Sequence, residues 1–478
     1  MKLKFTLLLL AITFLKSIGQ TVYPSSNFTL ISQLNPQVNT GGDGRKYSGC
    51  WGWRQDSTGR EYALVGTADR TYFIDVTNPA APSIRDSVIA RRAGCTWREI
   101  KNYKHFAYIV SDDAKPNSFQ IVDMRYLPDS VHVVYDDTTL FERGHTCWVD
   151  GNKLYVGGVT RSTGGTINMR VYSLANPKLP VLLRTLSDDF PSINYVHDMF
   201  VRNDTVYASA GGQGLHVFKF NPGPNNFTSL GSLTGYTGAG YNHSSYITKN
   251  GQTLVFCDEV PTGLPIKVAN VSNLSNITLD ATTKPNTNNE FVAHNPYVLG
   301  NKWAFISCYQ EGLLLYDIST PSNPVLKGFF DTYPQGGANV SNQYFGSSYR
   351  GNWGAYPYFP SGTILACDMQ NGIFLLSASS LLSVGVEEKE NTNLSASIYP
   401  NPANTNISIS FIPDNSQFCN ITLSDITGRI ILQENRNIKL VSPVAQESID
   451  VSNIESGAYI VTVFSGKKSI QKKIIITH

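Results

Sequence analysis

The sequence predicts an all-β protein, a β-propeller of seven blades followed by a small immunoglobulin-like β-sandwich. One unit recurs every 46 to 59 residues along most of the chain, as the positions of its marker residues show. Residues 21–384 show no sustained helical period, and a different pattern of short strands begins near residue 397. Repeats of this length, each with several short strands, are typical of propeller blades.

The repeat is marked by one position at the start of the first apolar run of each unit. In four consecutive units this position is a histidine, with an aromatic residue three positions later. Equivalent residues of a closed ring converge on its axis, so we expect four imidazoles to face one another there. Six or eight blades remain compatible, because the first and last units are the least regular. The seven aligned residues are Cys50, Trp97, His145, His197, His243, His294 and Trp353.

The propeller is assigned to residues 20–384, and its closure involves the N-terminal segment. The seventh unit ends at residues 374–376 without an outer strand. Residues 27–34 (NFTLISQL) resemble residues 226–233 (NFTSLGSL), which fall where an outer strand belongs. We therefore expect the N-terminal strand to complete the last blade and to remove exposed sheet edges.

The N-terminus and the composition indicate an exported protein. Residues 1–19 have the pattern of a signal peptide, with Lys2 and Lys4, an apolar run, and a small residue before Gln20. That run is too short for a spanning helix, and we expect no transmembrane helix in the mature chain. The net charge is +2 and charged residues make up 15% of the chain, which argues against a nucleic-acid partner.

The seven cysteines cannot all pair within the chain, because their number is odd. Cys257, Cys308 and Cys367 recur at one strand position of three units, which favours small buried hydrophobic residues over disulfides. Cys50 and Cys95 lie near the axis in neighbouring units. They form a possible disulfide in an oxidising compartment.

The composition changes after the propeller. Residues 385–396 are charged and polar and are assigned as a linker, and residues 397–478 alternate short strands with turns, as in a small β-sandwich. Residues 397–403 (SIYPNPA), 423–429 (LSDITGR) and 457–463 (GAYIVTV) resemble the C-terminal sorting domain of the type IX secretion system. This resemblance implies handling by that machinery. It also implies removal of the signal peptide and of the tail, and a mature protein that is released or attached to the outer-membrane surface.

The propeller also resembles a family. Residues 50–53 (CWGW), 97–101 (WREIK) and 312–318 (GLLLYDI) resemble the choice-of-anchor B proteins, which are built from LVIVD-type repeats. The resemblance covers about residues 45–377. It implies surface display through interchangeable anchors, with no assigned reaction.

The histidines are the residues that could carry chemistry. Imidazoles around an axis can bind a divalent transition metal, and an open coordination position would permit hydrolysis by a bound water. Asp198 and the pair Asp258 and Glu259 could add carboxylate ligands or a base. The alternative is structural: a histidine that opens an inner strand can bond the backbone of the neighbouring blade and fix the ring. The candidate ligands are His145, His197, His243 and His294.

Two functions follow from these observations. The first is a non-catalytic module that recognises a surface glycan or a protein through its loop face, since propellers present variable loops on a rigid ring. The alternative is a metal-dependent hydrolase with a histidine-ringed site at the axis. The tryptophans at the ring could stack on sugars or pack between blades. No catalytic Gly-x-Ser-x-Gly, His-Glu-x-x-His or Cys-x-x-Cys motif occurs in the sequence.

Overall fold

The computed structural model of the protein describes residues 21–113, 117, 119–161, 165–339, 343–345, 349–382, 396–413, 418–425, 430–438, 444–465 and 468–478. The chain divides into two compact units, Met1–Leu382 and Ser383–His478. The signal peptide expected at residues 1–19 lies outside the described residues, as does nearly all of the expected linker at residues 385–396.

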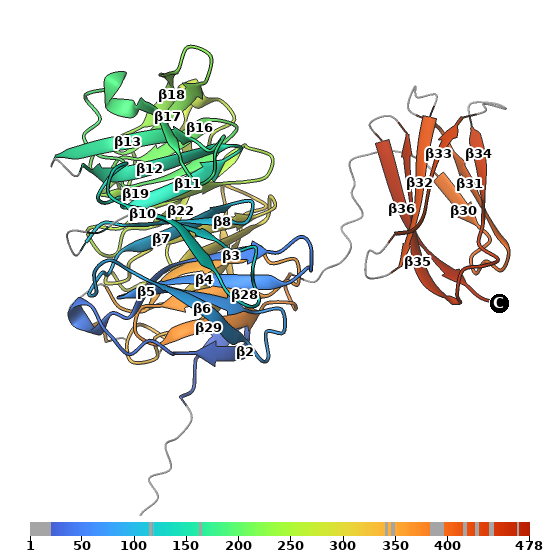
Figure 1. Ribbon diagram of the computed structural model, residues 1–478, viewed down its shortest axis with the longest axis horizontal. Coiled ribbons are helices and arrows are strands. Elements are labelled where there is room, and N and C mark those ends of the chain that lie inside the picture. Colours follow the sequence, from blue (N-terminus) through green and yellow to red (C-terminus); the bar gives the residue numbers. More distant parts are fainter. Residues whose placement is uncertain are drawn as a thin grey trace, which may run out of the picture. The chain divides into compact units, whose positions relative to one another are not determined.

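The first unit is a propeller of seven antiparallel sheets, which confirms the predicted fold class and blade number (Figure 1). In the first six blades the strands follow in sequence order from the axis outward. Blades 1 and 2 contain β3 (Tyr47–Arg54), β4 (Glu61–Thr67), β5 (Arg70–Asp75), β6 (Ser83–Ile89), β7 (Arg98–Tyr103), β8 (Phe106–Ser111), β9 (Phe119–Asp123) and β10 (His132–Asp137). Blades 3 and 4 contain β11 (Thr146–Asp150), β12 (Lys153–Thr160), β13 (Thr166–Ser173), β14 (Val181–Thr185), β15 (Asp198–Arg202), β16 (Thr205–Ser209), β17 (Leu215–Asn221) and β18 (Asn226–Leu233).

The remaining blades follow the same order. Blades 5 and 6 contain β19 (Asn242–Ile247), β20 (Thr253–Asp258), β21 (Ile266–Asn270), β22 (Thr278–Thr283), β23 (Asn295–Leu299), β24 (Trp303–Ser307), β25 (Leu313–Asp317) and β26 (Val325–Phe330). Blade 7 contains β27 (Asn352–Tyr356), β28 (Ile364–Asp368) and β29 (Gly372–Ser377). Single 3-10 turns occur at η1 (Gly42–Gly44), η2 (Leu186–Asp188) and η3 (Leu274–Asn276).

The N-terminal segment closes the ring, as the sequence predicts. Strand β2 (Thr29–Leu34) pairs antiparallel with β29 and supplies the outer strand of blade 7. The short β1 (Ser25–Ser26) pairs with β26 of blade 6, so one segment covers the edges of two neighbouring blades. Phe28 between them is 6% exposed and packs with Phe305 and Phe374. The N-terminal segment therefore holds blades 6 and 7 together by strand pairing as well as by burial of apolar area.

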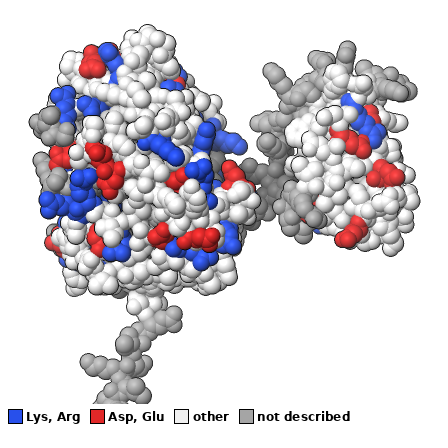
Figure 2. Space-filling model, viewed as in Figure 1, with Lys and Arg blue, Asp and Glu red and all other residues white. Residues whose placement is uncertain are grey.

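The core lies between successive blades. In one cluster, Tyr155 and Val171 of blade 3 pack against Met199 and Phe218 of blade 4. The middle strands of each blade have both faces covered, which explains their continuous apolar runs. On the face seen in Figure 2, Lys and Arg are interspersed with Asp and Glu.

All seven cysteines are buried free thiols. The repeated Cys257, Cys308 and Cys367 are fully buried within the strand layers, in keeping with the small hydrophobic role expected of them. The pair Cys50 and Cys95, for which the sequence allowed a disulfide, is not joined in the structure. Cys50 lies in the cluster that contains Cys367, whereas the thiol of Cys95 donates to Asp113 Oδ1 at 2.6 Å.

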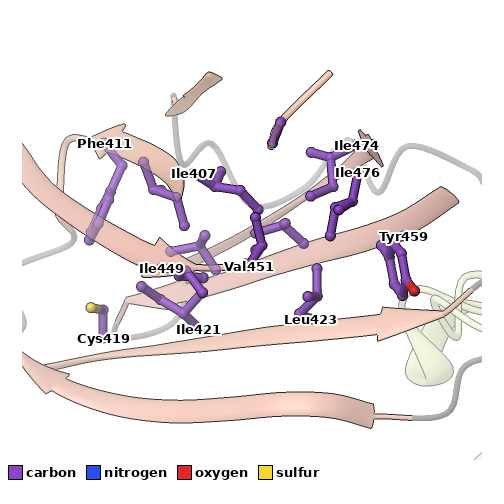
Figure 3. Close-up of a cluster of buried hydrophobic side chains, with 14 of the residues drawn as sticks. Ile407, Phe411, Cys419, Ile421, Leu423, Ile449, Val451, Tyr459, Ile474 and Ile476 are labelled. Atoms are coloured by element: carbon purple, nitrogen blue, oxygen red, sulfur yellow. The ribbon is translucent and has the colours of Figure 1, made fainter. Parts of the chain in front are cut away.

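The second unit is the expected β-sandwich, whose two sheets enclose an aliphatic core (Figure 3). One sheet contains β30 (Ala396–Tyr399), β31 (Asn406–Phe411) and β34 (Ala445–Asp450). The other contains β33 (Ile430–Asn437), β32 (Phe418–Asp425), β35 (Gly457–Ser465) and β36 (Lys468–Ile476). The alternation of buried and exposed residues along β31 and β32 gives one apolar face to each sheet.

The carboxyl of Asp331 is buried where the N-terminal segment meets blade 6. The backbone N–H of Asp331 donates to the carbonyl of Pro24, and the side-chain Oδ1 accepts from the N–H of Tyr333 at 2.8 Å. Burial raises the pKa of Asp331 to about 7. The Tyr333 bond opposes that shift, and the charges of Glu311 and Asp368 add to it. In the folded state this carboxyl therefore stays neutral at pH values where the same carboxyl in the unfolded chain, with a pKa of about 3.9, is ionised.

This pKa leads to a pH-dependent stability difference. Asp331 contributes most to stability below its unfolded pKa, and that contribution is lost as the pH rises toward about 7. Asp331→Asn should therefore raise the melting temperature relative to wild type by an amount that grows from pH 4 to pH 7 and is constant above. Thermal unfolding at pH 4, 5.5, 7 and 8 measures this difference, with the exposed Asp129→Asn as control. A difference that does not change with pH would contradict the assignment.

Candidate metal centre

The repeat brings the four histidines together at one end of the inner strands. Each lies at or immediately before the first residues of β11, β15, β19 or β23. Consecutive rings are in contact, with centroid distances of 4.0 Å, 4.4 Å and 4.2 Å from blade 3 to blade 6. The imidazoles therefore form an arc at the axis, as expected from their repeat position. Trp353 of blade 7 continues the arc, 4.3 Å from His294.

The first two histidines are bonded through side chains. His145 Nδ1 pairs with a carboxylate oxygen of Asp112, and its Nε2 lies 3.0 Å from His197 Nε2. Burial lowers the pKa of His145, but the charge and the hydrogen bond of Asp112 outweigh burial and raise it to about 9. His197 Nδ1 lies 3.0 Å from the hydroxyl of Tyr241. Burial and the neighbouring imidazoles hold the pKa of His197 well below its usual range, so this ring is neutral.

The other two histidines are bonded to the backbone of the following blade. His243 Nδ1 donates to the carbonyl of His294 at 3.1 Å, and His294 Nδ1 donates to the carbonyl of Trp353 at 2.7 Å. Burial lowers the pKa of both rings. These two bonds to the backbone of the next blade are the contacts expected if the histidines serve to fix the ring of blades. They also leave both Nε2 atoms as lone-pair acceptors, since the proton of each neutral ring is on Nδ1.

His243 Nε2 faces a second hydrogen-bond acceptor, a carboxylate oxygen, and a purely structural role for the histidine does not explain this approach. His243 Nε2 lies 3.8 Å from Glu259 Oε2. One ligand atom each from His197, His243 and Glu259 lie within 4.8 Å of one another. Within the described part of the chain, His294 Nε2 is buried without a hydrogen-bond partner. Donor atoms bound to one tetrahedral ion at ~2.0–2.1 Å lie roughly 3.3–3.4 Å apart, so the 3.8 Å between His243 Nε2 and Glu259 Oε2 fits this geometry after small side-chain rotations.

Two of the carboxylates proposed from the sequence are engaged elsewhere. Asp258 pairs with Lys267 at 2.8 Å inside blade 5, and both side chains are fully buried. Asp198 accepts from the hydroxyl of Thr146 at 2.7 Å and lines the chamber along the inner strands. Only Glu259 of the three joins the histidines.

Two chambers flank the histidines. The first, of about 120 Å³, is lined by His145, His197, His243 and Glu259 and by the aromatic rings of Trp97, Tyr349 and Trp353. The second, of about 40 Å³, lies along the inner strands and has room for roughly three water molecules. Among its lining residues, Trp148 contacts Trp51 at 6.0 Å and Tyr246 at 5.8 Å between ring centroids, so rings of three blades meet across the axis. A ligand of the histidines therefore enters from the first chamber.

The ring tryptophans divide between the two roles considered from the sequence. Trp53 is 7% exposed and stacks on Tyr62, so it belongs to the core. Trp97 stacks on Trp353 at 4.8 Å between centroids, and both line the first chamber. Arg45 lies over the ring of Trp97 at 5.3 Å.

Three functional residues were missed by sequence reasoning: Asp112, Tyr241 and Tyr309. Asp112 follows β8, Tyr241 precedes β19, and Tyr309 lies between β24 and β25. Each lies at the strand ends that surround the histidines, because the second strand of a blade ends where the first begins. The strand-end position was the available signal, and it narrows the candidates without showing which residues bond the side chains of the site.

Two segments of the chain match known families. Residues 397–477 match the model described as the secretion system C-terminal sorting domain. Residues 295–332 match the model described as the LVIVD repeat, and they span blade 6. Both resemblances inferred from the sequence are confirmed, while membership of the choice-of-anchor B proteins stays a prediction. A search of the curated proteins finds no match to the chain.

Solved structures with similar folds share little sequence. PorZ, an essential bacterial surface component of the type IX secretion system of Porphyromonas gingivalis, is 12% identical over 87% of this chain and 69% of its own, with a TM-score of 0.36. YCF48 bound to D1 peptide is 12% identical over 75% and 96%, with a TM-score of 0.47. The C-terminal WD40 domain of Sif2 is 11% identical over 69% and 81%, with a TM-score of 0.44. The propeller assignment rests on the chain's own sheet order.

Proposed function

We propose that this chain, an LVIVD-repeat propeller with a type IX secretion sorting domain, is a metalloprotein whose ion is held by His197, His243 and Glu259. The sorting domain directs export to the cell surface or the extracellular space. In the described part of the chain, no helix is long and apolar enough to cross a membrane. The observation that carries the proposal is the close group of ligand atoms from His197, His243 and Glu259, with the Nδ1 atoms of both rings bonded to Tyr241 and to the carbonyl of His294.

The bonds on the outer side of the rings are those that metal-binding histidines make. Such histidines almost always donate their second N–H to a carboxylate, a carbonyl or a water, which fixes the tautomer and the ring orientation. Here the carbonyl of His294 accepts from His243 Nδ1, and the hydroxyl of Tyr241 lies 3.0 Å from His197 Nδ1. His294 supports the site through its backbone, because its carbonyl orients the ring of His243.

The donor set selects the class of ion. Imidazole nitrogens with one carboxylate suit zinc, iron, copper or nickel, whereas magnesium and calcium prefer oxygen ligands throughout. An ion between the lone pairs of His243 and Glu259 would also remove the unfavourable approach of two acceptors. We therefore assign the site to a divalent first-row transition metal.

The metal gives the exported propeller a hydrolytic function. A bound metal lowers the pKa of its water to near ~7 and polarises a carbonyl or phosphoryl oxygen. The open position of the ion would face the first chamber, where Trp97, Tyr349 and Trp353 exclude bulk water from one side and can hold a substrate. Tyr241 would keep His197 oriented, and Asp112 would hold His145 beside it.

Hydrolysis can be tested on the purified protein with a panel of ester, phosphoester, amide and glycoside substrates. We expect activity that is lost on treatment with a chelator and restored by one of the four metals. Activity that survives complete metal removal would contradict the proposal, as would a metal-loaded protein inactive on every bond class.

A second function has one observation in its favour. The chamber mouth carries a stack of Trp97 on Trp353 with Arg45 above it, a surface that suits stacking on a sugar or on an aromatic side chain of a protein. A non-catalytic recognition module would bind its glycan or protein partner there without turnover. Glycan-array binding that is lost in Trp97→Ala but kept in the metal-free protein would favour recognition over hydrolysis.

A further inference from the structure

We infer that Tyr309 is a positioning residue of the metal centre, which holds Glu259 in its ligating orientation; the inference rests on the function proposed above. Its hydroxyl donates to Glu259 Oε1 at 2.7 Å, and the other carboxylate oxygen, Oε2, is the one that faces His243. One oxygen is thus fixed by the phenol, and the second is directed to the ion. A carboxylate held in this way loses less rotational freedom when the ion binds.

The contact crosses from one blade to the next. Tyr309 lies between β24 and β25 of blade 6, whereas Glu259 follows β20 of blade 5. In the repeat, Tyr309 follows Cys308 as Asp258 follows Cys257. Asp258 bonds to Lys267 within its own blade, but Tyr309 reaches the neighbouring blade. The departure from the repeat therefore falls at the tyrosine whose hydroxyl bonds Glu259.

The backbone of Tyr309 is in a conformation that tyrosine rarely adopts. Its φ is +32°, in the left-handed region, and its side chain is 1% exposed. The carbonyl of Tyr309 accepts from the N–H of Asn352 at 2.8 Å, and a Cβ at Gly351 would lie 2.1 Å from that carbonyl oxygen. Strained residues held by their surroundings cluster at functional sites, where the strain helps to set the geometry.

The packing of the ring adds a second constraint. The ring of Tyr309 lies 4.7 Å from that of His294 and 6.1 Å from that of Trp353 between centroids. Burial and the charge of Glu259 hold the pKa of Tyr309 well above its usual range, so the hydroxyl keeps its proton and remains a donor. Tyr309→Phe removes that donor and leaves the packing in place.

The test compares metal affinities by isothermal titration of the metal-free full chain with zinc. Tyr309→Phe should bind at the same stoichiometry with an affinity lower by about 10- to 100-fold, the usual effect of removing such a partner. The matched control is Tyr344→Phe, which removes a phenol-to-carboxylate bond to Glu311 outside the site and should leave affinity unchanged. Melting temperatures of the metal-free variants separate affinity from folding.

A double-mutant cycle with Glu259→Ala tests the route of the effect. If Tyr309 acts through Glu259, its substitution should cost no further affinity once Glu259 is absent. Equal affinities of wild type and Tyr309→Phe, or an undiminished loss in the Glu259→Ala background, would overturn the inference while leaving the metal centre intact. A wild-type protein that binds no ion would instead overturn the proposed function, and the inference with it.

Discussion

The double variant His197→Ala/His243→Ala is expected to lose metal binding by more than about 1,000-fold. Structural zinc binding is worth ~10–16 kcal/mol over four ligands, so removal of two should cost at least about 5 kcal/mol. These two rings lie at the centre of the arc, and together with Glu259 they form the group of ligand atoms within 4.8 Å. Isothermal titration and elemental mass spectrometry measure the loss.

Two controls separate metal binding from ring fixing. His294→Ala removes a ring whose bonded nitrogen contacts only the carbonyl of Trp353, so it should lower the melting temperature and retain the ion. His216→Ala removes a histidine of blade 4 outside the site, which bonds the carbonyl of Gln213, and should change neither metal content nor activity. If the double variant unfolds instead of only losing the ion, the structural interpretation of the histidines would gain over the metal.

The Lys267→Met variant is expected to destabilise the propeller by about 3–5 kcal/mol. Lys267 Nζ lies 2.8 Å from Asp258 Oδ2, and neither side chain is exposed to solvent. Loss of the ammonium leaves a buried carboxylate whose other partners are neutral donors, among them the hydroxyl of Tyr236 at 2.9 Å. Denaturant-induced unfolding of the propeller measures the change in free energy.

The companion variant Lys267→Met/Asp258→Asn removes both charges and should recover part of the lost stability. Neither variant should change the metal stoichiometry, because Asp258 is directed into blade 5 and not toward the axis. A loss of metal in Lys267→Met without a loss of stability would show that Asp258 belongs to the site after all.

The architecture and the convergence of the histidines were predictable because they depend on the repeat. An antiparallel blade places the start of its first strand at the same point of the ring each time, so His145, His197, His243 and His294 had to meet. The closure by β2 was predictable for the same reason, since residues 27–34 resemble the outer strand β18.

The partners of the histidines were not predictable from one sequence. Asp112, Tyr241 and Tyr309 come from loops of neighbouring blades, 33, 44 and 50 residues away from the side chains they bond. Loop length differs from blade to blade, so spacing alone does not bring these residues to the axis.

Neighbouring residues can also point to different environments. Asp258 and Glu259 are adjacent in sequence, yet the first ends β20 inside the blade and the second faces the histidines. The cysteines show the same limit. The repeat positions of Cys50 and Cys95 predict that both lie near the axis. In the structure, Cys50 packs within β3 beside blade 7, and Cys95 precedes β7 in a loop.

The measurement that tests the metal centre most directly is the metal content of the protein by elemental mass spectrometry. The protein is produced in a bacterial periplasm and purified without a histidine tag. We predict close to one zinc, iron, copper or nickel ion per chain, retained through dialysis and absent from His197→Ala/His243→Ala. A wild-type protein that stays free of all four metals after incubation with each of them would contradict the account and leave the histidines as structural contacts between blades.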